Sequence, residues 1–310
     1  MKKTFALIVS LCLMLTLFSA CGNKTANEAT ADPSAGDVTP APLSEQALQS
    51  ADFDGFSVGF TGAETFTDAD GDSAIRIYYD FCNHSDTATS AGSLLIVTAT
   101  QNGTELTRTE AAEESKSEYA ENDKCLLQKD AAIRCILEYK LPGAEMVTVT
   151  LDDFDEHKLN CDFAPNALSG APQNELTQTV SEPTLPDGLQ AEAALFDMYE
   201  VKLTGGELTE GKDSEKLLRV NVEYTNVSGG EDAVPGGSCV LVAYQDGVEL
   251  EQAEAAKPTA EDGNLMTELA EGESLTASVC FALKSESPVE LQLIDNWERA
   301  PLAGLIIPVK

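Results

Sequence analysis

Basic side chains are scarce in this sequence of 310 residues, which contains 19 Lys and Arg against 53 Asp and Glu. The formal net charge is -34, and the isoelectric point is near 4.1. Phosphate backbones and anionic membrane surfaces repel such a chain. We therefore expect no nucleic acid among its partners, and a ligand that is neutral, cationic or bridged by a divalent ion.

Histidine is nearly absent as well, since only His84 and His157 occur. This limits histidine-based hydrolase and transition-metal chemistry. The common nucleophile, zinc, P-loop and dinucleotide motifs are missing. Cys82 and His84 could form a nucleophilic pair, but their position at the end of a predicted strand favours a plain turn. We predict that the protein is not an enzyme and holds no cofactor.

A membrane-spanning helix is not predicted near the N-terminus, because the apolar run 5–18 is shorter than the ~20 residues that a bilayer requires. Two lysines precede this run, and Leu17-Phe18-Ser19-Ala20-Cys21 follows. The segment resembles a bacterial lipoprotein signal with its lipobox. We predict a signal peptide at 1–20 and lipidation of Cys21. The alternatives are a secretory signal with a chance cysteine and an uncut anchor.

Residues 21–50 are predicted to be a flexible tether, because they are rich in small and polar residues and lack apolar periodicity. Two acyl chains on Cys21 would give stable membrane attachment. We therefore expect an extracytoplasmic protein, lipid-anchored through Cys21 to the outer face of the bacterial cell membrane.

The remainder of the chain contains one unit twice. The segment 75–85 aligns with 218–228, and apolar residues occupy alternate positions in both. This period of two predicts a strand with one buried face, while Arg76 and Arg219 lie on the other, polar face. Further on, Asn102-Gly103 and Asp246-Gly247 both predict two-residue type I′ hairpin turns.

Short strands separated by turn signals predict an all-β chain with two tandem immunoglobulin-like antiparallel β-sandwiches. We assign them to residues 51–165 and 189–310, with a linker at 166–188. Apolar runs at 94–97 and 240–242 predict central strands, with a binding surface as the alternative. The charged segment 111–124 is left open as a short helix or a loop. Each predicted sandwich carries 8 basic and 23 acidic side chains, so the acidity belongs to both.

Three recurring features carry a resemblance to a known family: a strand that ends in Asn-x-Ser, a Gln-[Asn/Asp]-Gly hairpin, and the segment 270–274 before a further strand. They resemble the immunoglobulin-like domains of unknown function found on lipoproteins of Gram-positive bacteria. The resemblance implies a fold and a location, and it transfers no catalytic residue. Asn83 and Asn226 in these motifs are predicted to cap backbone groups at the strand ends.

Asp68, Asp70 and Asp72 form the best candidate for a metal site, because three carboxylates on a glycine-containing loop suit Ca²⁺. A solvated hairpin turn is the alternative, and the second unit has Lys212 in the corresponding turn.

Six cysteines remain once Cys12 and Cys21 are set aside. An exported protein could pair some of them, with Cys125 to Cys161 or Cys82 to Cys161 as candidate pairs, or could keep them as buried thiols. Because no cysteine is shared between the two units, the repeated fold does not depend on a disulfide. Their state is left open for Cys82, Cys125, Cys135, Cys161, Cys239 and Cys280. By alignment, Cys239 is predicted on an apolar face and Cys280 on a polar one.

The function predicted from these features is that of a non-catalytic binding or adhesion module of the cell envelope. Its partner would be an envelope or host protein or a glycan. Phe154 and Trp297, at corresponding strand ends, could contact a partner or plug the core. Two alternatives stay open: an accessory or structural subunit of an envelope complex, and an uncharacterised hydrolase or thiol redox protein.

Overall fold

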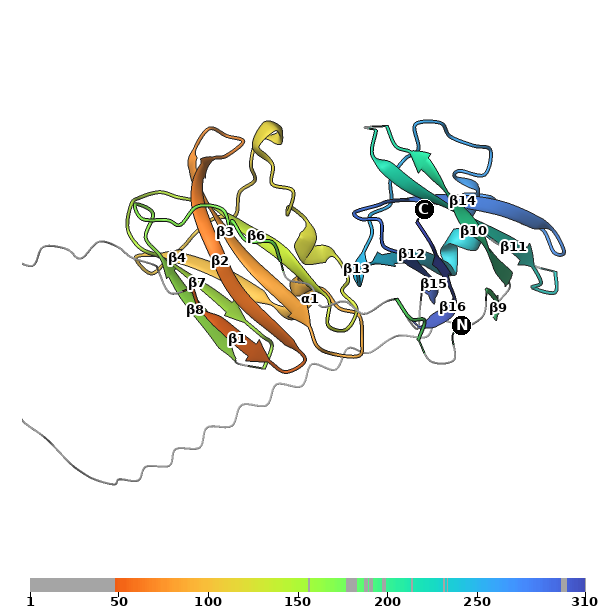
Figure 1. The fold of residues 1–310 in the computed structure, drawn as a ribbon, viewed down its shortest axis with the longest axis horizontal. Helices are drawn as coiled ribbons and strands as arrows, with labels where there is room; N and C mark the ends of the chain where they lie inside the picture. Colours follow the sequence, from red (N-terminus) through yellow and green to blue (C-terminus); the bar gives the residue numbers. More distant parts are fainter. Residues whose placement is uncertain are drawn as a thin grey trace, which may run out of the picture. The chain divides into compact units, whose positions relative to one another are not determined.

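The computed structural model describes residues 48–155, 157–176, 183–186, 189, 192–196, 199–212, 214–230, 232, 234–296 and 300–309. The predicted signal peptide, Cys21, most of the tether and Trp297 lie outside these residues. The described chain is nearly all β, with four antiparallel sheets arranged as two tandem sandwiches (Figure 1). In this part of the chain, the structure has no helix long and apolar enough to cross a membrane.

The first sandwich has two layers in the strand orders β1-β2-β3-β6 and β5-β4-β7-β8. Its elements are β1 (Ser50–Phe53), β2 (Phe56–Thr67), β3 (Ser73–Asn83), α1 (Ala91–Leu94), β4 (Ile96–Gln101), β5 (Thr104–Glu105), η1 (Glu113–Ser115), η2 (Asn122–Lys124), β6 (Ala132–Lys140), β7 (Val147–Asp152) and β8 (Lys158–Phe163).

The second sandwich repeats this arrangement, with orders β9-β10-β11-β14 and β13-β12-β15-β16. Its elements are β9 (Ala193–Phe196), β10 (Tyr199–Glu210), β11 (Lys216–Asn226), η3 (Pro235–Gly237), β12 (Cys239–Gln245), β13 (Val248–Glu249), η4 (Asn264–Met266), β14 (Ser274–Ala282), β15 (Val289–Asp295) and β16 (Pro301–Ile307). The prediction of tandem all-β sandwiches is therefore confirmed.

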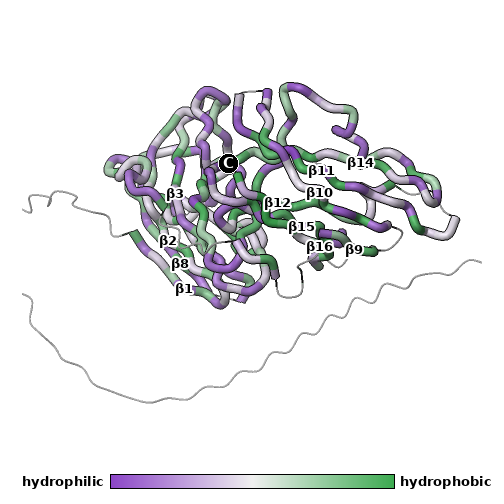
Figure 2. The backbone as a smooth tube through the Cα atoms, turned by 45° about the vertical axis from the view of Figure 1, so that its right-hand side comes forward, coloured by the Kyte–Doolittle hydropathy of each residue, from purple (hydrophilic) through white to green (hydrophobic). Residues whose placement is uncertain are grey.

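A separate core fills each sandwich. Alternate residues of β3, among them Ile75, Ile77 and Phe81, are fully buried in the first core. Their counterparts on β11, Val220 and Val222, are buried in the second. The predicted period of two thus places the expected side chains inside, and hydrophobic and hydrophilic residues are mixed along both sandwiches in Figure 2.

The two predicted hairpin turns are confirmed. Asn102 and Gly103 have φ values of 52° and 74°, and Asp246 and Gly247 have values of 54° and 77°. Positive φ at both central positions is the requirement of a type I′ turn, which asparagine, aspartate and glycine meet most readily. The flanking strands pair directly, with Gln101 opposite Thr104 in the first hairpin.

The polar faces of β3 and β11 are covered, which corrects the expectation of half-buried strands. Arg76 and Arg219 are 7% and 5% exposed. In each sandwich a long connecting segment, which we call the excursion, precedes the last strand of this sheet; it covers 106–131 in the first copy and 250–273 in the second. A backbone carbonyl of the excursion accepts a hydrogen bond from the arginine: Ser115 O from Arg76, and Lys257 O from Arg219. Cys280, predicted on a polar face, is consequently also buried.

The structure decides one open prediction and adjusts another. The segment 111–124 is a loop that contains the short 3-10 helices η1 and η2. The predicted strand at 94–97 begins only at Ile96, because Leu94 closes α1. Ser90 and Ser93 form a capping box at the start of α1, which favours this single helical turn over an earlier start of the strand.

Candidate binding site

The Asn-x-Ser motifs are structural in both sandwiches, as predicted. Asn83 is fully buried and donates from Nδ2 to the carbonyls of Thr87 and Leu127, at 2.9 Å each. Asn226 is equally buried and donates to Leu269 O at 2.8 Å. Both side-chain oxygens accept the backbone N–H two residues later. These amides satisfy backbone groups at the strand ends, so they are occupied in holding loops.

The three aspartates of the candidate calcium site do come together, with their carboxylate oxygens within 4.8 Å of one another. The ammonium of Lys140 lies among them, 2.8 Å from Asp70 Oδ2 and 2.9 Å from Asp72 Oδ2. These hydrogen bonds raise the pKa of Lys140. Asp68 also accepts a hydrogen bond from Thr109, which lowers its pKa. An ion would have to displace the lysine, so calcium binding stays a prediction.

His84 lies in an exposed chain of hydrogen bonds, of which the sequence indicates only the neighbours Cys82 and His84. Its Nε2 is 3.0 Å from Ser57 Oγ, and its Nδ1 is 3.4 Å from Asp130 Oδ1. Cys82 Sγ lies 3.8 Å from Nδ1. The side chains of His84 and Asp130 are 46% and 59% exposed, so solvent screens the pair. Ser57 comes from β2, far away in sequence, and no local motif indicates it.

All six described cysteines are free thiols. Neither candidate pair is bridged, so the alternative of reduced thiols is the state that the structure contains. Burial raises the pKa of every one, to about 11 for Cys125 and Cys239. A raised pKa keeps the thiol protonated and poorly nucleophilic at neutral pH.

Phe154 does not plug the core, because it is 68% exposed in the turn between β7 and β8. Asp153 holds this turn: its Oδ1 accepts the backbone N–H of Asp155 and of His157, and its Oδ2 lies 2.8 Å from His157 Nδ1. Partner contact therefore stays open for Phe154.

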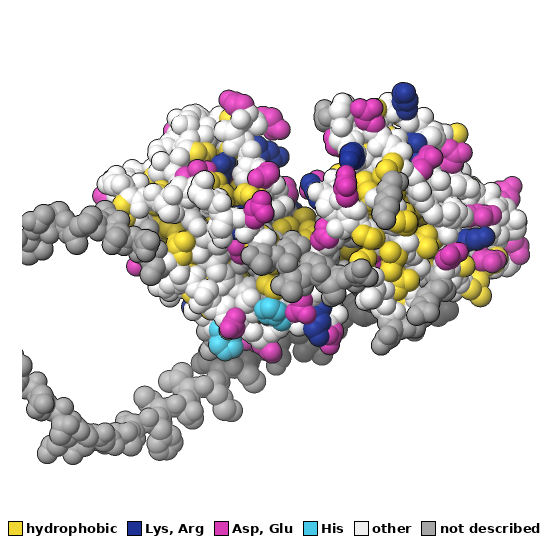
Figure 3. Space-filling model, viewed as in Figure 1, with side chains coloured by type: hydrophobic (Ala, Val, Ile, Leu, Met, Phe, Trp, Pro, Cys, Tyr) yellow, Lys and Arg dark blue, Asp and Glu magenta, His cyan; other side chains and the backbone are white. Residues whose placement is uncertain are grey.

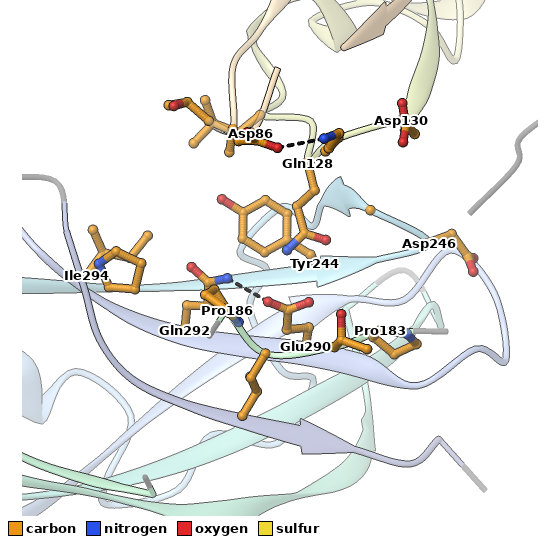
Figure 4. A pocket seen from close by; sticks show the side chains of 18 residues that line it. Asp86, Gln128, Asp130, Pro183, Pro186, Tyr244, Asp246, Glu290, Gln292 and Ile294 are labelled. Carbon is orange, nitrogen blue, oxygen red and sulfur yellow. Dashed lines mark hydrogen bonds and ion pairs between the residues drawn. The ribbon is translucent and has the colours of Figure 1, made fainter. Parts of the chain in front are cut away.

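A cavity of about 950 Å³ lies on the outer face of the sheet that contains β12 and β15. Tyr244 from β12 and Glu290, Gln292 and Ile294 from β15 line it, and Figure 4 shows them side by side. Pro183, Thr184, Leu185 and Pro186, from the described part of the predicted linker, line it as well, and so do residues 86–88, 126 and 128–130 from loops of the first sandwich. The Cβ of a non-glycine residue at position 304 would meet Leu185 at 2.7 Å, so glycine lets this segment approach the sheet.

Glu290 is the unusual residue of this cavity. It is 1% exposed, and its Oε1 accepts a hydrogen bond of 2.6 Å from Gln292 Nε2. Tyr244 and Ile306 flank it on the neighbouring strands. Among the described residues, no lysine or arginine lies within ion-pair distance of it. A buried carboxylate without a cationic partner is costly, because little of its hydration is replaced.

The described fold is that of a tandem β-sandwich protein, and its cavity holds the buried Glu290 of β15. The chain belongs to the family described as "Domain of unknown function (DUF5067)", whose model matches residues 33–153 and 175–295. The two matches confirm the tandem repeat that the self-alignment predicts. None of the curated proteins matches the chain significantly.

Among solved structures, the chain is similar to one described as a "putative lipoprotein from Staphylococcus aureus subsp. aureus NCTC 8325". The identity is 13%, the TM-score is 0.32, and the match covers 39% of this chain and 90% of the other. A TM-score this low establishes neither fold nor function for the present chain.

Proposed function

We propose that this protein is a lipid-anchored, non-catalytic binding module on the outer face of a Gram-positive cell membrane. The lipobox at Leu17–Cys21 and the tether that follows support the anchor. The cavity over β12 and β15, with its buried Glu290, is the observation that carries the binding role. Acidic side chains spread over both sandwiches in Figure 3, consistent with a solubilising coat.

The sandwiches are also proposed to be immunoglobulin-like. That fold places strand B beside E in one sheet and strand C beside F in the other. Here β3 pairs with β6 and β4 pairs with β7, and the second copy repeats both crossovers. The excursion at 106–131 stands where strand D would be. Such domains present loops at both ends, which suits a binding role.

The test of the binding role uses the soluble chain from Gly22 to Lys310, passed over immobilised cell-wall glycans and over surface proteins of host cells. We expect saturable retention on one of these surfaces. Runs with and without Ca²⁺ also test the site at Asp68, Asp70 and Asp72: calcium-dependent retention lost in an Asp70→Asn variant would support it. Failure to be retained on any surface, at low and high salt, contradicts a binding module.

The anchor has its own test. Full-length protein with Cys21→Ala should leave the membrane fraction, whereas Cys12→Ala, which changes a cysteine inside the predicted signal peptide, should leave attachment unchanged. Mass spectrometry of the native N-terminus should find a diacylglycerol-modified Cys21. Retention of the Cys21→Ala protein in the membrane would point to an uncut anchor.

A second candidate function is hydrolysis, favoured by the line Ser57–His84–Asp130. In that arrangement the imidazole would take the proton of Ser57 Oγ as the hydroxyl attacks an ester or amide carbonyl. The exposure of His84 and Asp130 argues against it. A fluorophosphonate probe separates the two functions, because labelling that is abolished by Ser57→Ala would support the hydrolase, whereas a binding module stays unlabelled.

A further inference from the structure

The two sandwiches differ most on the outer face of the sheet that lines the cavity. Position 290 on β15 corresponds to Thr148 on β7, since Val147 and Val289 pair with the equivalent Gln101 and Gln245. In the first copy this face is polar, with Thr148 bonded to Asp162 and Thr150 bonded to Asn160 across the strands. The fold thus accommodates an ordinary polar residue where the second copy has Glu290.

In the second copy this face is buried, and apolar side chains surround Glu290. Val242, Tyr244 and Ile294 are 4%, 2% and 6% exposed and form a separate hydrophobic cluster, against which Ala88 and Leu126 of the first sandwich pack. β12 is drawn mostly in the hydrophobic colour in Figure 2. A glutamate in these surroundings is not needed for the sandwich, because the first copy folds without it. It is therefore a candidate for recognition.

The charges of the residues that line the cavity indicate the sign of the charge on a ligand. Its charged residues are Asp86, Lys129 and Asp130 from loops of the first sandwich and Asp246 and Glu290 from the second. Lys129 is already paired with Asp86 at 2.7 Å. The remaining carboxylates favour a cation, and the aromatic ring of Tyr244 beside Glu290 adds a surface that attracts one.

We propose that this cavity binds an ammonium or guanidinium group on an aliphatic stem, with Glu290 as its counter-ion. The stem packs against Tyr244 and Ile294, and the cationic head reaches the carboxylate that Gln292 orients (Figure 4). The ion pair then supplies the positive partner that Glu290 lacks. This assignment rests on the proposed binding function and names the chemical class of its ligand.

The test is an NMR titration of the soluble chain from Gly22 to Lys310 with capped lysine, capped arginine and 1,5-diaminopentane. Capped norleucine serves as the neutral isostere. With the cations we expect saturable shifts in the amide resonances of β12 and β15. Norleucine should bind at least about tenfold more weakly, a difference of about 1.4 kcal/mol in binding free energy. A preference for the free diamine over the capped amino acids indicates a small-molecule ligand, and the reverse indicates a peptide side chain.

Glu290→Gln keeps the shape of the side chain and its hydrogen-bonding oxygen, and it should weaken cation binding by at least about tenfold. Glu223→Gln is the matched control, because it removes the same charge from an exposed position on β11. Equal binding of norleucine and lysine by the unchanged protein, or equal lysine binding by the folded Glu290→Gln variant, overturns the assignment. Retention on an envelope surface without binding of any cation would refute this assignment alone and leave the proposed function standing.

Discussion

Arg76 in the first sandwich and Arg219 in the second occupy the same position in the repeat, yet their charges are neutralised from different places. Arg76 Nε donates to Glu138 on the neighbouring strand β6 at 2.6 Å, and Nη1 donates to Glu64 on β2 at 3.1 Å. In the second copy Cys280 stands opposite Arg219, and Arg219 Nε has no hydrogen-bond partner. Its closest carboxylate, Asp262 at 3.1 Å, comes from the excursion.

The difference shows which part of this arrangement of arginine, carbonyl and carboxylate the fold needs. Both copies bury an arginine beneath the excursion and let it donate to a backbone carbonyl there. The acid is interchangeable, provided that some carboxylate reaches the guanidinium, because a buried charge must be compensated. In the first copy the sheet itself supplies the acid. In the second copy the excursion supplies it, so the order of that loop and the arginine depend on each other.

The largest expected effect is therefore that of Arg76→Ala, which removes the guanidinium that neutralises the half-buried Glu138. We expect a loss of about 3–5 kcal/mol in the free energy of unfolding of the first sandwich. Arg219→Ala should cost less, about 1–3 kcal/mol, because its acidic partners are more exposed. Denaturant unfolding measures both, with the exposed Arg108→Ala as control. Equal losses for the two arginines would contradict the comparison.

The buried asparagines should behave alike, in contrast to the arginines. Asn83→Ala and Asn226→Ala each remove a buried amide that bonds backbone groups on both sides of the strand end, at a cost of about 1–3 kcal/mol. Thermal unfolding should show a similar decrease for both variants. A Ser85→Ala variant removes only the adjacent hydroxyl and provides the matched control. A loss confined to one sandwich would mean that the motif has different roles in the two copies.

A smaller and more local effect is expected for Asp262→Ala. It removes the carboxylate that joins Arg219 to the backbone N–H of Thr259, so the excursion 250–273 should open more often. We expect a loss of about 1–2 kcal/mol, seen as faster hydrogen exchange in that segment. Glu261→Ala, next to it, should leave exchange nearly unchanged. Unchanged exchange in Asp262→Ala would show that the loop is held by other contacts.

The smallest effect concerns pH and the first sandwich alone. The hydrogen bond to Asp153 raises the pKa of His157. Burial opposes ionisation of Asp153, but the hydrogen bonds from His157 lower its pKa on balance. The contribution of His157 to the free energy of unfolding is complete below its unfolded pKa of about 6.5, and it is lost as the pH rises through the raised folded pKa. The contribution of Asp153 to the free energy of unfolding is complete above its unfolded pKa of about 3.9, and it is lost as the pH falls through the lowered folded pKa.

The melting temperatures of the wild type and His157→Ala should therefore differ most between about pH 4 and pH 6.5. The gap should narrow toward pH 8 and toward pH 3. The difference should be small throughout, since the His157 side chain is 66% exposed. A gap that widens at alkaline pH would show that the pair does not titrate in this way.

The sequence alone predicts those parts of the fold that depend on neighbouring residues, namely the hairpin turns and the strands. The hairpins at 102–103 and 246–247 follow from backbone preference, and β3 and β11 follow from alternation. Alternation assigns a side chain to a face, but it carries no information on whether another segment covers that face, so it does not indicate the burial of Arg76 and Cys280. Glu290 had a weak signal: the run Val240–Val242 is apolar at successive positions, as expected for a strand that is covered on both sides.

The free, buried thiols have a consequence for how the protein matures. Among the described cysteines none is paired, and burial keeps all six protonated. The described state of both sandwiches therefore contains no bond that has to be formed by oxidation. Reducing agents have no disulfide to break among these residues, which packing and hydrogen bonds hold together.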